Sequence, residues 1–381
     1  MKNKNYELID NYIEKLMKES TPDKPIWNIE NIRQGKKAHW NYIDGCMMTS
    51  LLSLYNETKH QEYFDFVDNY IDYYIFDDGE ILGYQIEHFR LDDINESRVL
   101  FDLYEKTKKE KYLKAIAKTY GQILTQPRTY EGNFWHKDIY PNQVWLDGLY
   151  MAMPFYALYE TKMNDCKNIQ DIINQYKLVR KHLFDNEKQL YYHGYDASKS
   201  VFWADKETGL SKNFWLRAIG WFTVSLVDVA EIIKEKCPNE YVYVASLLKE
   251  IVDGILKYQD KDSKMFYQVV DHKEVEGNYL ETSGSAMISY AILKAARLGI
   301  LNENYRTIGN EIFDGICNKY LTEVNGDLNL EGICLVAGLG PEKDKRRDGT
   351  IAYYLSEPIV KNDAKGVGPL IMAYTEVRKT L

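Results

Sequence analysis

The segment from Trp145 to Tyr150 places one carboxylate, Asp147, between large aromatic side chains at the start of an apolar, helix-like run. A carboxyl group beside Trp and Tyr is suited to donate a proton, because partial desolvation disfavours its charged form. The position also suits a helix cap, since a carboxylate at a helix start accepts hydrogen bonds from free backbone N–H groups. Asp147 is therefore a candidate general acid, with capping as the alternative.

Other short segments also combine aromatic rings with histidines or charged groups. Each lies near the start of an apolar, helix-like run, so helices arranged in a ring would bring these segments to one opening. They are residues 39–42, 88–95, 134–136, 192–196, 214–221 and 281–284.

The elements that must position these groups follow from an internal repeat. The pairs Leu54-Tyr55, Leu103-Tyr104 and Leu158-Tyr159 each close an apolar run and precede a Thr-containing turn, with a period near fifty residues. Such a period indicates stacked helical hairpins. In each hairpin the leading helix is apolar nearly all round, whereas the trailing one, such as residues 112–123, carries charges on one side. We expect the leading helices to be buried and the trailing ones to cover them.

Six such leading helices are expected, near Trp40, Leu91 and Trp145 and at residues 215–232, 283–298 and 366–377. They predict an all-α toroid or an open helical solenoid. No Pro-, Gly- or Ser-rich linker divides the chain, which favours one closed domain over residues 1–381 and a monomer. Glycines at the helix starts would let backbones approach closely. Residues 325–358 are expected to form irregular loops.

Composition narrows the class of partner. The chain has 32 Tyr, 7 Trp and 13 Phe, rings that line carbohydrate sites but also fill large cores. The net charge is −9 and no long basic block occurs, so nucleic acid and anionic membranes are poor partners. Neither an apolar signal core nor a membrane-spanning run is present, and we expect a cytoplasmic protein.

Metal and cofactor sites are not expected. The five cysteines are widely scattered and fit neither a disulfide framework nor a zinc pattern. The sequence contains no His-Glu-x-x-His motif, calcium loop, phosphate-binding loop or dinucleotide fingerprint.

Several longer motifs in order resemble the unsaturated uronyl hydrolases of glycoside hydrolase family 105, most closely their unsaturated rhamnogalacturonyl hydrolases. The matching pieces are residues 134–137, 144–151, 214–221, 347–350 and 356–358. The resemblance implies an (α/α)6 barrel with Asp147 as the catalytic acid/base and Asp92 as the second acid. Neighbouring Asp93 is the alternative second acid, because the stretch holds two acids and Ser97 replaces the Gly common in the family.

The same segments provide candidate substrate-binding residues. Arg217 could pair with the uronate carboxylate through two hydrogen bonds. Sugar faces could stack on aromatic rings, and sugar hydroxyls could bond to histidine or amide groups. These candidates are Tyr42, Trp145, Trp215 and Trp221 for stacking, and Asn41, His136 and His193 for hydrogen bonding.

The activity implied by the resemblance is hydration of the C4=C5 double bond of a terminal unsaturated galacturonic acid, which releases it from rhamnogalacturonan fragments. Alternatives remain open. They are an inverting glycosidase using Asp92 and Asp147, an unsaturated glucuronyl hydrolase for another polysaccharide, an epimerase with a histidine pair, and a non-catalytic oligosaccharide- or protein-binding repeat.

Overall fold

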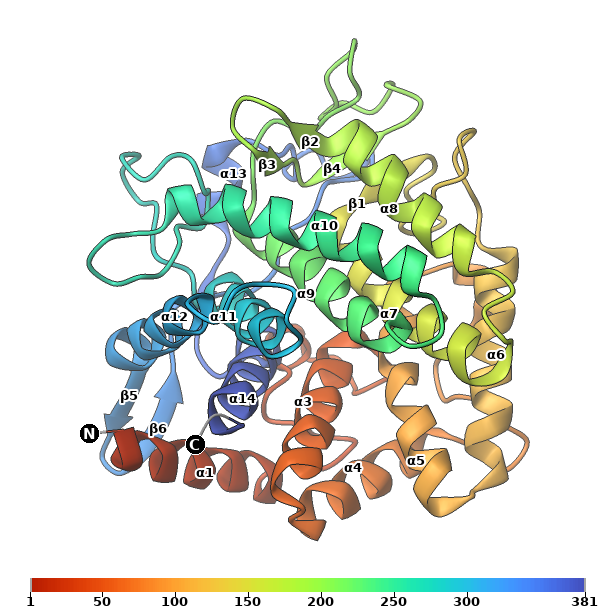
Figure 1. Cartoon of the computed structure of the whole chain (residues 1–381), viewed down its shortest axis with the longest axis vertical. Helices are drawn as coiled ribbons and strands as arrows, with labels where there is room; N and C mark the ends of the chain where they lie inside the picture. Colours follow the sequence, from red (N-terminus) through yellow and green to blue (C-terminus); the bar gives the residue numbers. More distant parts are fainter. Residues whose placement is uncertain (1, 380–381) are drawn as a thin grey trace.

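Six inner helical segments form a closed ring in the computed structural model, which describes residues 2–379. Each inner segment contacts the next one along the chain, and the last, α14, returns to contact the first, α3. The expected (α/α)6 toroid is therefore confirmed, and a solenoid is excluded (Figure 1). The inner segments are α3 (Tyr42–Thr58), the 3-10 segment η2 (Leu91–Val99) continuing as α5 (Leu100–Thr107), α7 (Leu146–Met163), α9 (Leu216–Ile233), α11 (Thr282–Arg297) and α14 (Ala364–Arg378).

Outer helices surround this ring, and one of them comes from the N-terminus. Five follow their inner partners: α4 (Gln61–Tyr74), α6 (Glu110–Thr125), α8 (Ile169–Leu183), α10 (Pro238–Ile255) and α12 (Tyr305–Tyr320). The partner of α14 is α1 (Lys2–Lys18). The Tyr374 hydroxyl donates to the carbonyl oxygen of Tyr6 at 3.2 Å, and Arg378 pairs with Asp10 at 3.1 Å. The sixth hairpin thus joins the two ends of the chain, a pairing that the sequence did not predict.

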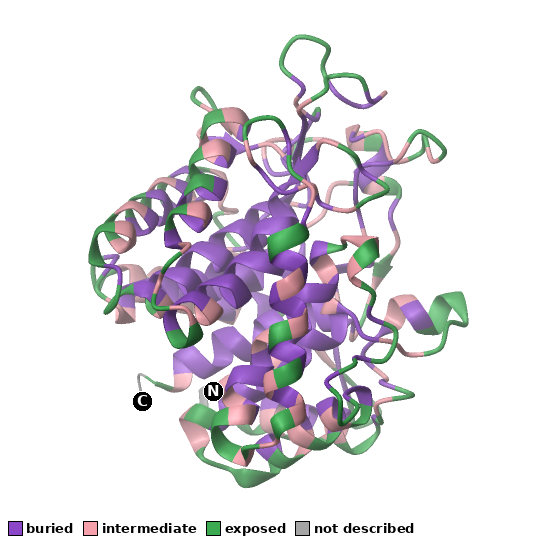
Figure 2. Cartoon of the chain, turned by 90° about the vertical axis from the view of Figure 1, so that its right-hand side faces the viewer, coloured by how far each residue is buried: buried purple, intermediate pink, exposed green. Residues whose placement is uncertain are grey.

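Burial follows the division into inner and outer helices. Helices α7 and α9 are buried along nearly their whole length, as their uniformly apolar sequences predict. Outer helices such as α6 and α8 bury one face and expose the other, and the two layers are distinct in Figure 2.

Short strands and helices occupy the connections. Four two-stranded antiparallel pairs occur in the described chain: β1 (Gln143–Trp145) with β4 (Gly194–Asp196), β2 (Phe184–Asp185) with β3 (Leu190–Tyr191), β5 (Leu321–Val324) with β6 (Asp327–Leu330), and β7 (Ile333–Cys334) with β8 (Ile359–Val360). Short helices are α2 (Ile29–Gln34), α13 (Ile351–Ser356), η1 (Ile86–His88) and η3 (Leu256–Tyr258). The region 325–358, expected to form irregular loops, contains short strands and also the helix α13, which the sequence did not predict.

The glycine at the start of α14 allows the close approach expected of the inner helices. A Cβ added at Gly368 would lie 2.9 Å from the carbonyl oxygen of Cys46 on α3. A backbone atom cannot move aside as a flexible side chain can, so a larger residue would separate the two helices that close the ring.

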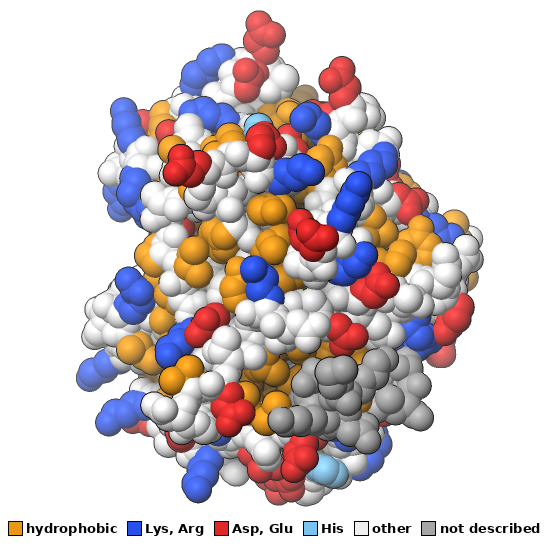
Figure 3. Space-filling view, turned by 90° about the vertical axis from the view of Figure 1, so that its left-hand side faces the viewer, with side chains coloured by type: hydrophobic (Ala, Val, Ile, Leu, Met, Phe, Trp, Pro, Cys, Tyr) orange, Lys and Arg blue, Asp and Glu red, His pale blue; other side chains and the backbone are white. Residues whose placement is uncertain are grey.

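Figure 3 shows no large patch of a single charge on the face that it presents. Basic and acidic side chains are interspersed with apolar ones there. Among the described residues, no helix is long and apolar enough to cross a membrane.

Candidate active site

Two acids, each beside a histidine, lie at the starts of neighbouring inner segments. Asp147 is in the first turn of α7, and its Oδ2 lies 3.2 Å from Nε2 of His193. Asp92 is in the first turn of η2, and its Oδ1 lies 3.4 Å from Nε2 of His136. Segments η2 and α7 pack against each other. The ring therefore assembles four of the residues that the sequence singled out.

Trp145 joins the two acid–histidine pairs. Its ring stacks on His136 with centroids 4.4 Å apart and meets His193 edge-on at 5.6 Å. The pairing of β1 with β4 sets this arrangement, because it places Trp145 opposite Gly194, the residue after His193. Trp145 is 5% exposed, so it forms a largely dry wall between the acids.

Asp92 is held in its charged form. Burial raises the pKa of Asp92, but Lys137, whose Nζ is 2.6 Å from Oδ2, and His136 together bring this pKa below its usual value. For His136, burial lowers the pKa to about 4 despite the nearby carboxylates of Asp92 and Asp147. The pair at neutral pH is therefore a carboxylate beside a neutral imidazole.

Asp93 has a different environment. Burial, and then the charge of Asp92, raises the pKa of Asp93 to about 7. After burial, the largest contribution to the raised pKa of Tyr84 comes from Asp93. The backbone carbonyl of Asp93 accepts a hydrogen bond from Trp40 Nε1 at 2.9 Å. Asp92, rather than Asp93, is thus the acid that contacts His136.

A tyrosine that the sequence did not single out fixes the orientation of the His193 ring. Nδ1 of His193 lies 2.7 Å from the hydroxyl oxygen of Tyr354, in α13. Trp215 packs on both, with centroids 4.8 Å from His193 and 6.0 Å from Tyr354. The only sequence signal for Tyr354 was its place within the C-terminal motif region.

Arg217 lies in the first turn of α9 and is 1% exposed. It donates hydrogen bonds to the carbonyl oxygens of Cys334 at 2.5 Å and Leu335 at 3.3 Å, and to Ser283 Oγ at 3.3 Å. These bonds hold the beginning of the 335–350 loop against the ring. Its expected contact with a substrate carboxylate remains a prediction.

The other three candidates, Asn41, Tyr42 and Trp221, lie at the start of α3 and in the second turn of α9. Asn41 caps α3, accepting hydrogen bonds from the backbone N–H groups of Ile43 and Asp44. Tyr42 meets Trp221 edge-on at 6.4 Å between centroids, and Trp221 stacks on Tyr150 at 4.5 Å. Their expected contacts with sugar likewise remain predictions.

Residues 9–381 match the model of Glycosyl Hydrolase Family 88. The chain belongs to this family. A solved family 105 glycoside hydrolase from C. acetobutylicum ATCC 824 is 41% identical, with 99% of each chain covered and a TM-score of 0.90. The family 105 resemblance is thereby confirmed, and the chain is a glycoside hydrolase of the unsaturated uronyl hydrolase group.

Two further relatives of this family 88 chain are more distant. The unsaturated rhamnogalacturonyl hydrolase YesR of Bacillus subtilis (strain 168) is 23% identical over 265 residues, which are 68% of this chain and 72% of that protein. An unsaturated glucuronyl hydrolase specific for heparin shares the fold, with a TM-score of 0.71 at 12% identity and coverage of 99% and 96% of the two chains.

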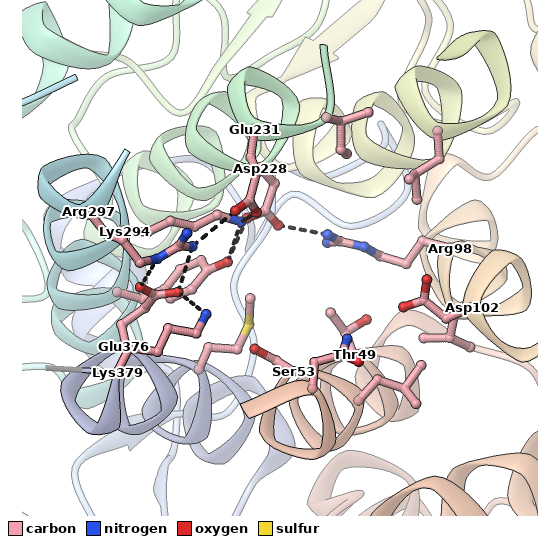
Figure 4. Close-up of a pocket in the computed structure, with 17 residues that line it drawn as sticks. Thr49, Ser53, Arg98, Asp102, Asp228, Glu231, Lys294, Arg297, Glu376 and Lys379 are labelled. Atoms are coloured by element: carbon pink, nitrogen blue, oxygen red, sulfur yellow. Dashed lines mark hydrogen bonds and ion pairs between the residues drawn. The ribbon is translucent and has the colours of Figure 1, made fainter. Parts of the chain in front are cut away.

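The family 88 ring has a hollow of about 320 Å³ at the end opposite the two acids. Its wall is an ion-pair network in which Asp228 binds Arg98 and Lys294, each at 2.7 Å, and Arg297 binds Glu376 at 2.7 Å (Figure 4). These charged residues pair with one another, and none of them is a candidate active-site residue. We therefore assign them to closure of the ring. Within residues 2–379, no group of three or more His, Cys, Asp or Glu residues could hold a metal ion.

Proposed function

We propose that this enzyme hydrates the C4=C5 double bond of a terminal unsaturated galacturonic acid and so releases it from rhamnogalacturonan-derived oligosaccharides. The observation that carries the proposal is the pair of acids, Asp147 and Asp92, each beside a histidine on either side of Trp145. The name of the relative YesR supports the choice of sugar. The natural role would be the breakdown of pectin fragments.

Asp147 is the general acid and base of the proposed reaction. The bond attacked is a vinyl ether, so a proton from Asp147 adds to C4 and leaves an oxocarbenium-like centre at C5. Water adds to C5 and returns a proton to the Asp147 carboxylate. The resulting hemiketal opens and expels the neighbouring sugar, so one water is consumed and the acid is regenerated.

Asp92 supplies negative charge close to the developing cation. The ion pair with Lys137 at 2.6 Å keeps it ionised, and a fixed carboxylate stabilises an oxocarbenium-like centre electrostatically. The walls for the sugar are Trp145 and Trp215, which enclose His193.

The test follows the ultraviolet absorbance of the alkene after mixing the enzyme with unsaturated galacturonosyl-rhamnose. We expect the absorbance to fall as rhamnose appears. A saturated galacturonosyl-rhamnose should remain intact. Release of rhamnose from both compounds without loss of absorbance would instead establish an ordinary glycosidase.

A further inference from the structure

We propose that Arg347, in place of the Arg217 expected from the sequence, binds the carboxylate of the unsaturated uronic acid and so selects charged over uncharged sugars. This inference rests on the proposed function and names how its site recognises the acid group of the substrate. It arises from the hydrogen bonding of the cations around the two acids.

Three other cations close to the site are already engaged in contacts. Lys137 pairs with Asp92 at 2.6 Å. Arg217 donates to two backbone carbonyls and a hydroxyl. Lys365 is buried between Asp363 at 3.1 Å and Glu30 at 3.3 Å. Breaking any of these contacts to bind a substrate would leave a buried polar group unpaired.

Arg347 differs in its free donors. Among the described residues, none accepts a hydrogen bond within standard geometry from its terminal nitrogens Nη1 and Nη2. Its one ion pair is made through Nε, to Asp344 Oδ2 at 3.5 Å. The Arg347 side chain is 25% exposed, so the guanidinium can be reached from solvent. Two parallel N–H groups of this kind match the two oxygens of a carboxylate.

The guanidinium also lies beside the wall of the acid site. A Cβ added at Gly338 would be 3.2 Å from Nη1 of Arg347 and 3.3 Å from Cζ3 of Trp145, so the guanidinium and the indole border the same point. Burial lowers the pKa of Arg347, whereas the neighbouring Tyr353, Tyr140, Glu357 and Asp344, in that order, raise it. Tyr140 in turn packs on Trp145 with centroids 4.7 Å apart.

The turn that follows Arg347 holds it in place. Thr350 donates from its backbone N–H and its hydroxyl to Asp348 Oδ1, at 3.0 and 2.7 Å. Gly349 has a φ of +71°, a left-handed conformation that favours glycine, and its carbonyl accepts a hydrogen bond from Asn213 at 2.7 Å. The 347–350 motif therefore anchors an arginine whose own end is free.

The experiment compares two substrates and three variants. The substrates are unsaturated galacturonosyl-rhamnose and its methyl ester, which lacks the negative charge. The variants are Arg347→Gln, Arg347→Lys, and Lys345→Gln as a matched control, because Lys345 is a 71%-exposed cation in the same loop. We expect Arg347→Gln to lower kcat/KM for the acid about 10- to 100-fold, the usual effect of losing a charged hydrogen bond. For the methyl ester we expect kcat/KM to change by less than about threefold. Comparing the acid and the ester on the wild type and on Arg347→Gln isolates the contribution of the pair between guanidinium and carboxylate.

Arg347→Lys should retain part of the preference for the acid, and Lys345→Gln all of it. Equal losses on both substrates, or no loss on the acid, would overturn the proposal.

A second measurement uses the unmodified enzyme and does not require a variant to fold. Phenylglyoxal modifies accessible guanidinium groups, and peptide masses report which arginine has reacted. Galacturonate should protect Arg347 from modification, whereas the methyl ester of galacturonate should not. Equal rates of Arg347 modification with both compounds would refute the assignment. If the enzyme fails to consume the alkene at all, the proposed function is wrong, while protection by galacturonate still decides the role of Arg347.

Discussion

Nε2 of His193 lies 3.2 Å from Oδ2 of Asp147, the acid at the start of α7. His193 is fully buried, and the Tyr354 hydroxyl holds its other ring nitrogen at 2.7 Å. The imidazole therefore cannot turn without breaking a hydrogen bond, and the Asp147 carboxyl has a fixed neighbour on one side.

Asp147→Asn should reduce alkene consumption by at least about 100-fold, because an amide cannot transfer the proton. The variant should still bind the unsaturated disaccharide and melt close to the wild-type temperature. The exposed Asp138 lies in the same part of the chain, and Asp138→Asn is the control that should keep full activity. Residual turnover in the Asp147 variant near the wild-type rate would show that another group supplies the proton.

Tyr354→Phe should lower kcat about 3- to 10-fold, as expected for one lost hydrogen bond. Because the hydroxyl acts through His193, the pH profile of kcat should also shift, a change that a purely structural effect would not produce. Tyr156→Phe is a matched control, since it removes a hydroxyl that contacts Asp171 at 3.1 Å away from His193. An unchanged pH profile in the Tyr354 variant would contradict the positioning role.

The sequence predicted the ring and most of the acid site for a physical reason. Uniformly apolar helices must be buried, and in a ring their starts converge at one opening, which is where Asp92, His136, Trp145 and Asp147 lie. The convergence of the helix starts needs only local pattern, whereas the six-hairpin barrel and the choice of Asp92 came from the family resemblance. The structure confirms the closed ring.

Long-range polar contacts could not be predicted in the same way. Tyr354 bonds to His193 across 161 residues of sequence, and Arg217 bonds to Cys334 across 117. Neither contact leaves a pattern in the local sequence. The pairing of α1 with α14 was missed for the same reason, because helix amphipathicity does not reveal which neighbour a helix covers.

Substitutions of the two adjacent acids, Asp92 and Asp93, should have different effects on activity. Asp92→Asn removes the carboxylate beside Lys137 and His136, and we expect a loss of kcat of at least about 100-fold, since a fixed charge near the developing cation is lost. Asp93→Asn should retain activity within about threefold, because Asp93 is not in contact with that pair. The assay is alkene absorbance for both variants, and the reverse ranking would assign the second acid to Asp93.

The pH dependence of stability gives an independent test of Asp93. Its pKa is raised to about 7 in the folded protein, from about 3.9 in an unfolded chain. Between these values the folded state binds more protons, so the stability that this carboxyl contributes is fully present at acid pH and is lost as the pH rises to 7. The Asp93→Asn variant has no carboxyl group at this position, so it does not undergo this loss of stability. From pH 5 to pH 8, the free energy of unfolding of the variant should therefore rise relative to wild type by more than about 1 kcal/mol. Urea unfolding at both values measures this difference, and a constant offset would contradict the raised pKa.

Closure of the ring between α3 and α14 depends on Gly368. Gly368→Ala should destabilise the protein by about 1–3 kcal/mol, because the new Cβ would lie 2.9 Å from a backbone oxygen of Cys46 that has little room to move. Gly121→Ala in α6 is the matched control, since its Cβ would lie 3.7 Å from Ile86 Cδ1, an ordinary contact. Alanine also has the higher helix propensity, so this control should be neutral or more stable by about 0.5–1 kcal/mol. Chemical unfolding of both variants gives the comparison. Equal stabilities would mean that the two helices can separate without cost and that close packing at Gly368 does not hold the ring shut.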